Sequence, residues 1–368
     1  MTESQAYIAF NLMQNMGPRH LDELLARHGS AVAAWEAIPE HPAFDGREVD
    51  WQRELKRAAE LGVTLLTPVD ADYPPSLMEV PAHPLCLYVK GSVAALAKPA
   101  VALVGTRRST AYGRDTAERF AHDLAQDGWV IVSGLALGID AAAHRGALAA
   151  GGVTVGVIGS ALDRFYPEQN LELAREIVAH GGAVVSQFPF GRECDQHTFP
   201  VRNQVVAAMV RGVVAVEAPS RSGTLITTSL AADLGVTVMA VPARVDNPMS
   251  AGCLKLIRDG ARLVRSAEDV EEELSELIPR SQLAPSAAAA DSPALPRRPR
   301  LERVRPEVTL EESLVIRHLD ADGVSLERLL ALTGLPPAKL NALCMTLRIK
   351  GRLRYLPGNR VALAGSGN

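Results

Sequence analysis

Three glycine-containing turns in the chain combine small residues with groups that bind anions. The first, VALVGTRRSTAYG, follows a run of apolar residues and contains Gly105, Thr106, Arg107 and Arg108. We expect a tight turn at Gly105 and a helix that begins near Ala111. The free N–H groups at such a helix start favour phosphate, and arginine adds a forked donor. We predict that Arg107 faces a ligand and that Arg108 is solvated.

The second turn, VSGLALGIDAAAH, contains Gly134 and Gly138, where the missing side chains let a ligand approach the backbone. Asp140 lies in the first turn of the next expected helix, where a carboxylate suits the helix dipole. We therefore predict that Asp140 caps this helix rather than acting in catalysis. We predict a hydrogen-bonded structural role for His144, four residues later.

The third turn, VEAPSRSGTLITT, opens a helix with Ser222, Gly223 and Thr224. These residues offer backbone N–H groups and hydroxyls together, which suits a phosphate. Helix capping explains the same residues equally well. Both interpretations therefore stay open at this turn.

A fourth segment, HTFPVRNQVVAAM, places Arg202 and Asn203 at or near the start of a helix. A cation at that position opposes the helix dipole, so its presence favours an anionic partner over stability. Phe199 either stacks on a nucleobase or packs as a hydrophobic staple against its own helix.

Several familiar catalytic and cofactor-binding patterns are missing from the sequence. It contains no GxGxxG after the first apolar strand and no GxxxxGK[ST], which disfavours dinucleotide binding and ATP hydrolysis. It also contains no GxSxG or HExxH. The four cysteines lie far apart without metal-binding spacing. We therefore predict no cofactor, no metal site and no catalytic residue.

Residues 91–278 alternate short valine-rich strands with amphipathic helices, most of which end in glycine. Strands that are apolar on both faces are typical of a parallel sheet covered on two sides. This pattern predicts an α/β fold with a doubly wound, mostly parallel, Rossmann-like sheet. Ligands bind such sheets at the carboxyl ends of the strands, so the four segments above should meet there as a DNA-binding domain.

Three further regions flank this sheet. Residues 1–90 predict a helical N-terminal domain with an extended connector, in which the turn near Gly17 resembles either a helix-hairpin-helix or a simple helical hairpin. Residues 279–308 are rich in Pro, Ala, Ser and Arg and predict a flexible linker. Residues 309–368 predict three helices and a hairpin, the pattern of a winged helix that contacts duplex DNA or docks a protein.

The overall composition narrows the classes of partner. The chain has 368 residues, 47% of them hydrophobic, a net charge of −4 and a pI near 6.2. This balance disfavours a polybasic binder, although a local basic groove can still hold DNA. No signal-peptide pattern and no run of 18 apolar residues is present. We therefore expect a cytoplasmic protein with no membrane contact.

Taken together, ALVGTRRSTAYG, IVSGLALGIDAAAHRGAL, FPVRNQVVAAM, SGTLITTSLA and two further motifs over about 98–265 resemble the DNA-processing protein A family (DprA, also called Smf). The resemblance implies a homodimer that binds single-stranded DNA without nucleotide or other cofactor. It also implies delivery of that DNA to a RecA-type recombinase in natural transformation or recombination. The implied DNA pocket contains the residues that match the motifs: Gly105, Arg107, Gly134, Phe199, Arg202 and Asn203.

The chain departs from the family pattern at four positions. Gln204 stands where the family commonly has a second arginine, and Glu168 stands where a basic residue often follows the Tyr-Pro pair. Gln187 replaces a glutamate, and Ala243 replaces a glycine after the last strand. These changes affect which DNA contacts can be transferred, but not the expected fold.

Two other functions compete with DNA binding. Related Rossmann-like folds bind nucleotides or hydrolyse N-glycosidic bonds, and Glu217 at the end of a strand would then be the active carboxylate. The winged helix could instead read duplex DNA as part of a transcription factor, with the α/β domain sensing a small ligand.

Overall fold

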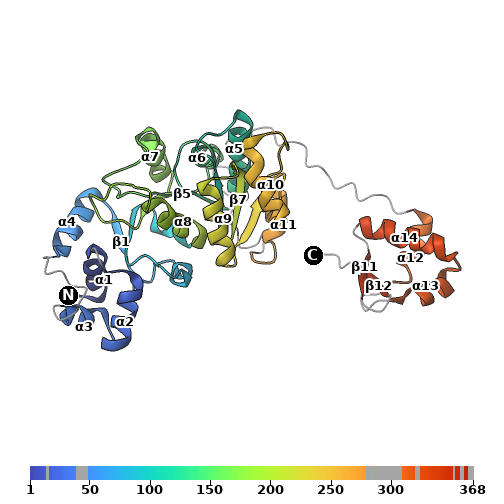
Figure 1. The fold of residues 1–368 in the computed structure, drawn as a ribbon, viewed down its shortest axis with the longest axis horizontal. Coiled ribbons are helices and arrows are strands. Elements are labelled where there is room, and N and C mark those ends of the chain that lie inside the picture. The colour runs from blue at the N-terminus through green and yellow to red at the C-terminus, as the bar shows by residue number, and fades with distance from the viewer. Residues whose placement is uncertain are drawn as a thin grey trace. The chain divides into compact units, whose positions relative to one another are not determined.

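The computed structural model describes residues 1–13, 16–38, 49–278, 283, 309–319, 324–350, 353–356 and 360–363. The chain forms two compact units, Met1–Pro293 and Ala294–Asn368. Figure 1 shows the helices and strands of both units. Every helix in the described part of the chain is too short or too polar to span a bilayer.

The N-terminal part of the first unit is helical, as predicted. Its helices are α1 (Glu3–Leu12), α2 (Pro18–His28), α3 (Ala31–Glu36) and α4 (Trp51–Leu61). Thr2 and Gln5 form a reciprocal capping box that starts α1. Phe10, Leu21 and Leu24 bury their side chains in a small core between α1, α2 and α3.

The main sheet of the described residues has nine strands in the order β1-β2-β6-β5-β4-β3-β7-β8-β9. The six predicted strands are confirmed and run parallel from β6 to β8: β3 (Ala100–Gly105), β4 (Val130–Ser133), β5 (Thr154–Val157), β6 (Ala183–Ser186), β7 (Gly212–Glu217) and β8 (Thr237–Ala240). The connector supplies β1 (Thr64–Leu66) and β2 (Leu87–Gly91), which extend one edge antiparallel. The short parallel strand β9 (Arg262–Leu263) lies at the other edge.

Helices follow the parallel strands, as the sequence predicted. They are α5 (Ala111–Gln126), α6 (Ile139–Ala149), α7 (Leu171–Ala179), α8 (Thr198–Ala208), α9 (Gly223–Asp233), α10 (Ala251–Arg258) and α11 (Ala267–Leu274). Gly128, Gly151, Gly181 and Gly235 all adopt positive φ shortly after a helix. These glycines end their helices because the left-handed conformation strains other residues.

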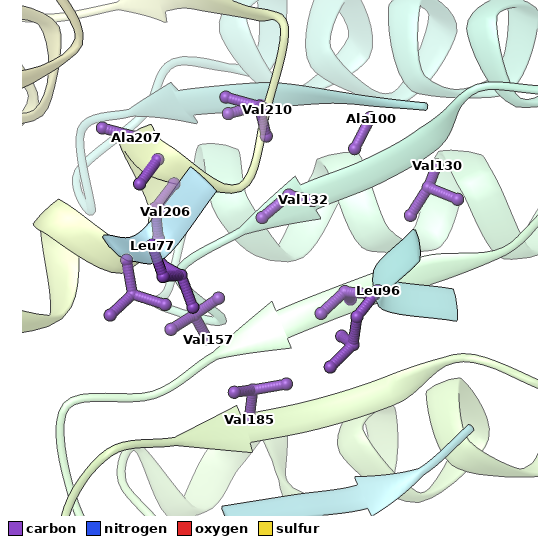
Figure 2. Close-up of a cluster of buried hydrophobic side chains, with 14 of the residues drawn as sticks. Leu77, Leu96, Ala100, Val130, Val132, Val157, Val185, Val206, Ala207 and Val210 are labelled. Atoms are coloured by element: carbon purple, nitrogen blue, oxygen red, sulfur yellow. The ribbon is translucent and has the colours of Figure 1, made fainter. Parts of the chain in front are cut away.

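The sheet is apolar on both faces, and each strand divides its side chains between two cores. Ala102 and Val104 of β3 belong to one cluster, whereas Val101 and Leu103 belong to the other. Figure 2 shows valines of several strands in the first cluster, with Leu77 beside them. Leu77 comes from a 3-10 turn at Pro75–Glu79, so the connector covers part of this face.

The second unit has the order of a winged helix. It contains α12 (Leu310–Ile316), β10 (Val324–Ser325), α13 (Leu326–Thr333), α14 (Pro337–Ile349), β11 (Leu353–Leu356) and β12 (Arg360–Leu363). The strands form a sheet in the order β10-β12-β11. The expected hairpin turn at 357–359 lies outside the described residues. The expected linker at 279–308 also lies outside the described residues, except for Leu283. This residue packs into a core of the first unit.

Candidate functional site

A pocket lies at the carboxyl edge of the parallel sheet, where the sequence predicted that the turns would meet. It opens to solvent, and its empty space, with the solvent at its opening included, is about 310 Å³. The loops after β3, β4 and β5 and the first turns of α8 line it, through Arg107, Gly134, Ala136, Leu137, Gly159, Tyr166, Pro167, Phe199 and Arg202. Two arginines and two aromatic rings therefore face one concavity.

Arg107 and the two rings form a stacked group within this pocket. The Arg107 guanidinium carbon lies 4.6 Å from the centre of the Phe199 ring, a cation–π contact. The Tyr166 ring lies on the same Phe199 ring at 6.3 Å between centres, tilted by 53°. Arg107 thus faces the pocket, as predicted, while Arg108 is exposed and does not line it.

Arg202 is almost fully buried behind this group. Its guanidinium donates hydrogen bonds to the carbonyl oxygens of Gly134 and Val157, the second at 2.5 Å. Burial lowers the pKa of Arg202 to about 10, against the opposing attraction of Asp140. The sequence favoured an anionic partner for Arg202 over a stabilising role. The structure gives Arg202 partners within the chain, Asp140 among them, and contact with DNA stays a prediction.

Asp140 is the buried counter-charge of Arg202 rather than the predicted helix cap. Gly138 precedes α6, and no side chain caps that helix. One Asp140 oxygen accepts a 3.4 Å hydrogen bond from the N–H of Ala136. Burial raises the pKa of the Asp140 carboxyl, and the attraction of Arg202 opposes that rise. A buried carboxylate needs such a partner, because desolvation of an isolated charge is costly.

Gly134 leaves room for the buried side chains of Arg202 and Asp140. A Cβ atom at Gly134 would lie 2.5 Å from Nη1 of Arg202 and 2.7 Å from Oδ2 of Asp140. Asn203 helps to orient the guanidinium, since its side-chain oxygen accepts from Nε of Arg202 at 3.1 Å. Gly134 therefore belongs to the support of the pocket as well as to its wall.

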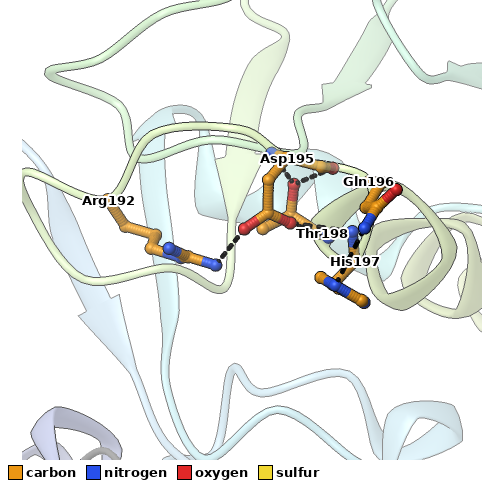
Figure 3. Close-up of polar contacts among 5 residues, drawn as sticks. All are labelled: Arg192, Asp195, Gln196, His197 and Thr198. Carbon is orange, nitrogen blue, oxygen red and sulfur yellow. Dashed lines mark hydrogen bonds and ion pairs between the residues drawn. The ribbon is translucent and has the colours of Figure 1, made fainter.

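The start of α8 is set by a polar cluster that the sequence did not point to (Figure 3). The Asp195 carboxylate accepts from the backbone N–H groups of His197 and Thr198 at 2.7 and 2.9 Å and pairs with Arg192. These donors, led by the N–H of Thr198, lower the pKa of Asp195. These hydrogen bonds close the turn that leads into α8, which begins at Thr198, just before Phe199.

Phe199 packs away from the predicted staple position on its own helix. A Cβ atom at Gly159 would lie 3.1 Å from Cδ1 of Phe199, so the ring sits against the loop after β5. With Arg107 over it and Tyr166 beside it, Phe199 joins three loops of the pocket.

Gly105 serves a different purpose from the predicted tight turn. It does not have positive φ, but a Cβ atom there would lie only 2.4 Å from Cγ1 of Ile139. Glycine is needed because α6 approaches β3 closely. Thr106 lies beside it and accepts a hydrogen bond from the N–H of Arg108. Neither Gly105 nor Thr106 lines the pocket.

The third turn acts as a helix cap. The Ser222 hydroxyl accepts from the N–H of Thr224 at 3.0 Å and starts α9 at Gly223. The turn follows β7, which lies beside β3 on the side opposite β4. These residues share the carboxyl edge with the pocket but do not line it.

His144 has the predicted structural role. Its Nδ1 hydrogen-bonds to the Thr154 hydroxyl at 2.7 Å, and burial lowers the pKa of the imidazole to about 3. Within the described ranges, no group of three or more His, Cys, Asp or Glu side chains is arranged to hold a metal ion.

Similarity to known proteins agrees with this architecture. The sequence model of the DNA recombination-mediator protein A family matches residues 64–275, and that of the DprA winged helix domain matches residues 299–359. The first match alone covers more than half of the chain.

The chain belongs to the DNA recombination-mediator protein A family. Protein Smf of Synechocystis is 30% identical over 392 residues, covering 98% of both chains. DNA processing protein DprA of Streptococcus pneumoniae is 41% identical over 205 residues, covering 56% of this chain and 72% of the relative.

Two solved structures of family members share the fold. DNA processing protein A from Streptococcus pneumoniae superposes with a TM-score of 0.63 at 32% identity, covering 74% of this chain and 98% of that one. The same protein from Helicobacter pylori gives 0.53 at 28% identity, covering 59% and 98%. The subject of the Helicobacter structure is its unique single-stranded DNA binding mode.

Three of the four departures from the family pattern fall on half-buried residues. The amide nitrogen of Gln187 and the amide oxygen of Gln204 are buried without a hydrogen-bond partner among the described residues. Glu168 is exposed and starts a 3-10 turn after Pro167, and Ala243 is half-buried after β8. Their effect on DNA contacts stays a prediction.

Glu217, the candidate carboxylate of the competing enzyme, is committed to a structural role. Its two oxygens accept from the N–H and the hydroxyl of Thr110 at 2.8 and 2.9 Å. Thr110 in turn caps α5, so Glu217 holds the helix start in place. A buried carboxylate used in this way is poorly placed to attack or protonate a substrate.

Proposed function

We propose that this protein binds single-stranded DNA at the pocket formed by Arg107, Phe199 and their neighbours. The observation that carries the proposal is the stack of Arg107 over Phe199 in a concavity of a family member. A guanidinium binds phosphate, and an aromatic ring binds an unpaired base.

The shape of the site favours single strands over duplex. Bases of a duplex are paired and stacked, so a ring inside a concavity cannot reach their faces. An unpaired strand can turn one base inward while its phosphates stay outside. The Helicobacter relative, whose structure concerns single-stranded DNA binding, supports the same choice.

We assign the predicted DNA-binding residues to three roles. Arg107 and Phe199 act at the pocket itself, and buried Arg202 adds positive field behind it, held by Gly134 and Asn203. Gly105 ends β3, and Thr106 and Arg108 lie on the loop that carries Arg107. The turn at Ser222–Thr224 would extend the path of the strand along the carboxyl edge of the sheet.

The biological role that fits this binding is recombination mediation in the cytoplasm. We propose that a homodimer protects the strand and helps to load a RecA-type recombinase, in natural transformation or recombination, without catalysis or cofactor. Membership of the recombination-mediator family supports this role. Duplex contact by the winged helix also stays a prediction. Two lysines of that unit, Lys339 and Lys350, form ion pairs with Glu311 and Glu312 of the same unit.

Fluorescence anisotropy of a labelled oligo-dT tests the proposal. We expect tighter binding of oligo-dT than of a duplex of equal length, and an affinity that falls steeply with salt because bound cations are released. Equal or tighter duplex binding would place the DNA site elsewhere, in the winged helix or the linker. The absence of any DNA binding would reject the proposal.

A further inference from the structure

The loop that leads into α8 also packs against the N-terminal helices. This loop, residues 187–197, joins β6 to α8 and ends just before Phe199. The Phe190 ring packs edge-on against Tyr88 of β2, with ring centres 5.2 Å apart and planes at 84°. Phe190 and Leu162, which follows β5, both pack against a small core that α1, α4 and β2 share. Two loops that lead to pocket residues therefore rest on the N-terminal part of the chain.

Glu54 of α4 holds this loop through its backbone. The carboxylate is 8% exposed, and its Oε1 accepts from the N–H of Phe190 at 2.9 Å and from the hydroxyl of Tyr88 at 2.8 Å. Burial raises the pKa of the Glu54 carboxyl, and the hydrogen bond from Phe190 opposes that rise. A buried carboxylate without donors is costly, so the positions of α4 and of the loop depend on each other.

Further contacts continue along the loop to the start of α8. The N–H of Gly191 donates to Asp163 at 2.8 Å, and the carbonyl of Arg192 accepts from the N–H of Ala161 at 2.8 Å. Arg192 also pairs with Asp195, whose carboxylate accepts from the N–H groups at the start of α8 (Figure 3). Because these contacts follow one another along a short loop, a displacement at α4 is transmitted to α8.

We propose that Glu54 is a positioning residue for the DNA site. Through the loop at 187–197 it holds the start of α8, and with it Phe199, in the geometry that binds a strand. This inference rests on the proposed function and gives the N-terminal helices a part in DNA binding without contact to the strand. Displacement of α4 would change DNA affinity although α4, which the structure describes in full, lies outside the pocket lining.

Two substitutions at Glu54 separate its hydrogen bonds from its charge. Glu54→Gln keeps an oxygen that can accept both bonds, whereas Glu54→Ala removes the acceptor. Anisotropy of labelled oligo-dT measures affinity, at a temperature where scanning fluorimetry shows every variant folded. We expect Glu54→Ala to weaken binding about 3- to 30-fold, as for changes in a connecting network, and Glu54→Gln to stay within about twofold of the wild type. Equal losses in both variants would overturn the hydrogen-bonded path. If Glu54→Ala does not fold, Glu54→Asp, which shortens the side chain by one methylene, takes its place with the same expectation.

Glu3→Ala is the matched control, because Glu3 is also a carboxylate of the N-terminal helices that accepts two backbone hydrogen bonds. Its donors are the N–H groups of Ala31 and Val32, at 2.8 and 3.2 Å, and neither belongs to the loop at 187–197. Glu3→Ala should leave oligo-dT affinity unchanged even where it lowers Tm. An equal loss of affinity in Glu3→Ala would show that general destabilisation causes the effect, and would overturn the inference.

A double-mutant cycle with Asp195→Ala tests the path between the two sites. Asp195→Ala should itself weaken binding, because its carboxylate holds the N–H groups at the start of α8. If Glu54 acts through the same loop, the double variant should bind about as tightly as the weaker single variant. Losses that multiply would mean that the two residues act independently, and unchanged affinity in Glu54→Ala would mean that α4 does not position the site; either result overturns the inference. Failure of the wild type to bind oligo-dT would instead reject the proposed function itself.

Discussion

Arg202→Met tests whether Arg202 is a buried structural cation or a direct DNA contact. The side chain is 6% exposed and hydrogen-bonds to the carbonyls of Gly134 and Val157, facing Asp140. Methionine keeps much of the volume but leaves the Asp140 carboxyl unpaired in the core. Leaving a buried carboxylate without a nearby opposite charge in this way costs about 3–5 kcal/mol. At about 2–4 °C per kcal/mol for a domain of this size, Tm should fall by about 6–20 °C.

The loss should depend on pH, with a sign set by Asp140. Burial already raises the pKa of this carboxyl above its unfolded value, and Arg202 restrains the rise. Without Arg202 the pKa rises further, so the folded state of the variant prefers the protonated carboxyl. A group with a raised pKa contributes stability at low pH and loses it as pH increases. The Tm deficit of Arg202→Met should therefore be largest near neutrality and shrink toward pH 4.

Differential scanning fluorimetry across pH 4–8 measures this deficit. The control is the double variant with Asp140→Asn, which removes both charges and should recover part of the lost Tm at neutral pH. Suppose instead that Arg202→Met lowers Tm by less than about 2 °C, independently of pH, and weakens DNA binding alone. Arg202 would then be a direct DNA contact, and the assignment of Asp140 as its counter-charge would be wrong.

Three further predictions follow from the same contacts. Arg107→Ala should weaken oligo-dT binding by about 1.5–3 kcal/mol, or roughly 10- to 150-fold, and flatten the slope of log K against log salt by about 0.7. Tm should stay unchanged, since Arg107 is exposed; a fall in Tm would contradict this role. Gly105→Ala should lower the free energy of unfolding, measured in urea, by about 1–3 kcal/mol, because the added Cβ would clash with Ile139. An unchanged free energy of unfolding would refute the close packing. Deletion of residues 294–368 should leave oligo-dT anisotropy titrations unchanged, because all pocket residues lie in the first unit, and lost binding would assign the main site to the winged helix.

The fold was largely readable from the sequence. The strands of the sheet were visible as short valine runs, because both faces of a parallel sheet are buried. Each strand therefore needs apolar side chains on both sides, as in β3, which contributes to both cores. The helices between them appeared because glycine ends them, as Gly128 ends α5. The edge strands β1 and β2 were less distinct, since they lie in a proline-rich connector. There β2 pairs antiparallel with β6, and β1 pairs antiparallel with β2.

The candidate site was readable only in part. The carboxyl ends of parallel strands meet at one edge, so the turn at Arg107 and the helix start at Phe199 could be placed together. Tyr166 was missed as a pocket residue, because a Tyr-Pro pair in a loop has no periodic pattern that shows where its ring points. The capping cluster at Asp195 was missed for the same reason.

The amino-acid sequence by itself determined the local features of this protein: the strands, the helix ends and the turns that face the carboxyl edge. These depend on neighbours within a few residues, which a sequence states directly. Only the tertiary structure decided the partners of charged and small residues. Arg202 binds the carbonyl of Gly134, 68 residues earlier, and Gly105 is glycine because of Ile139. Such partners are set by how distant segments pack, so the roles of the same residues could not be read from their spacing.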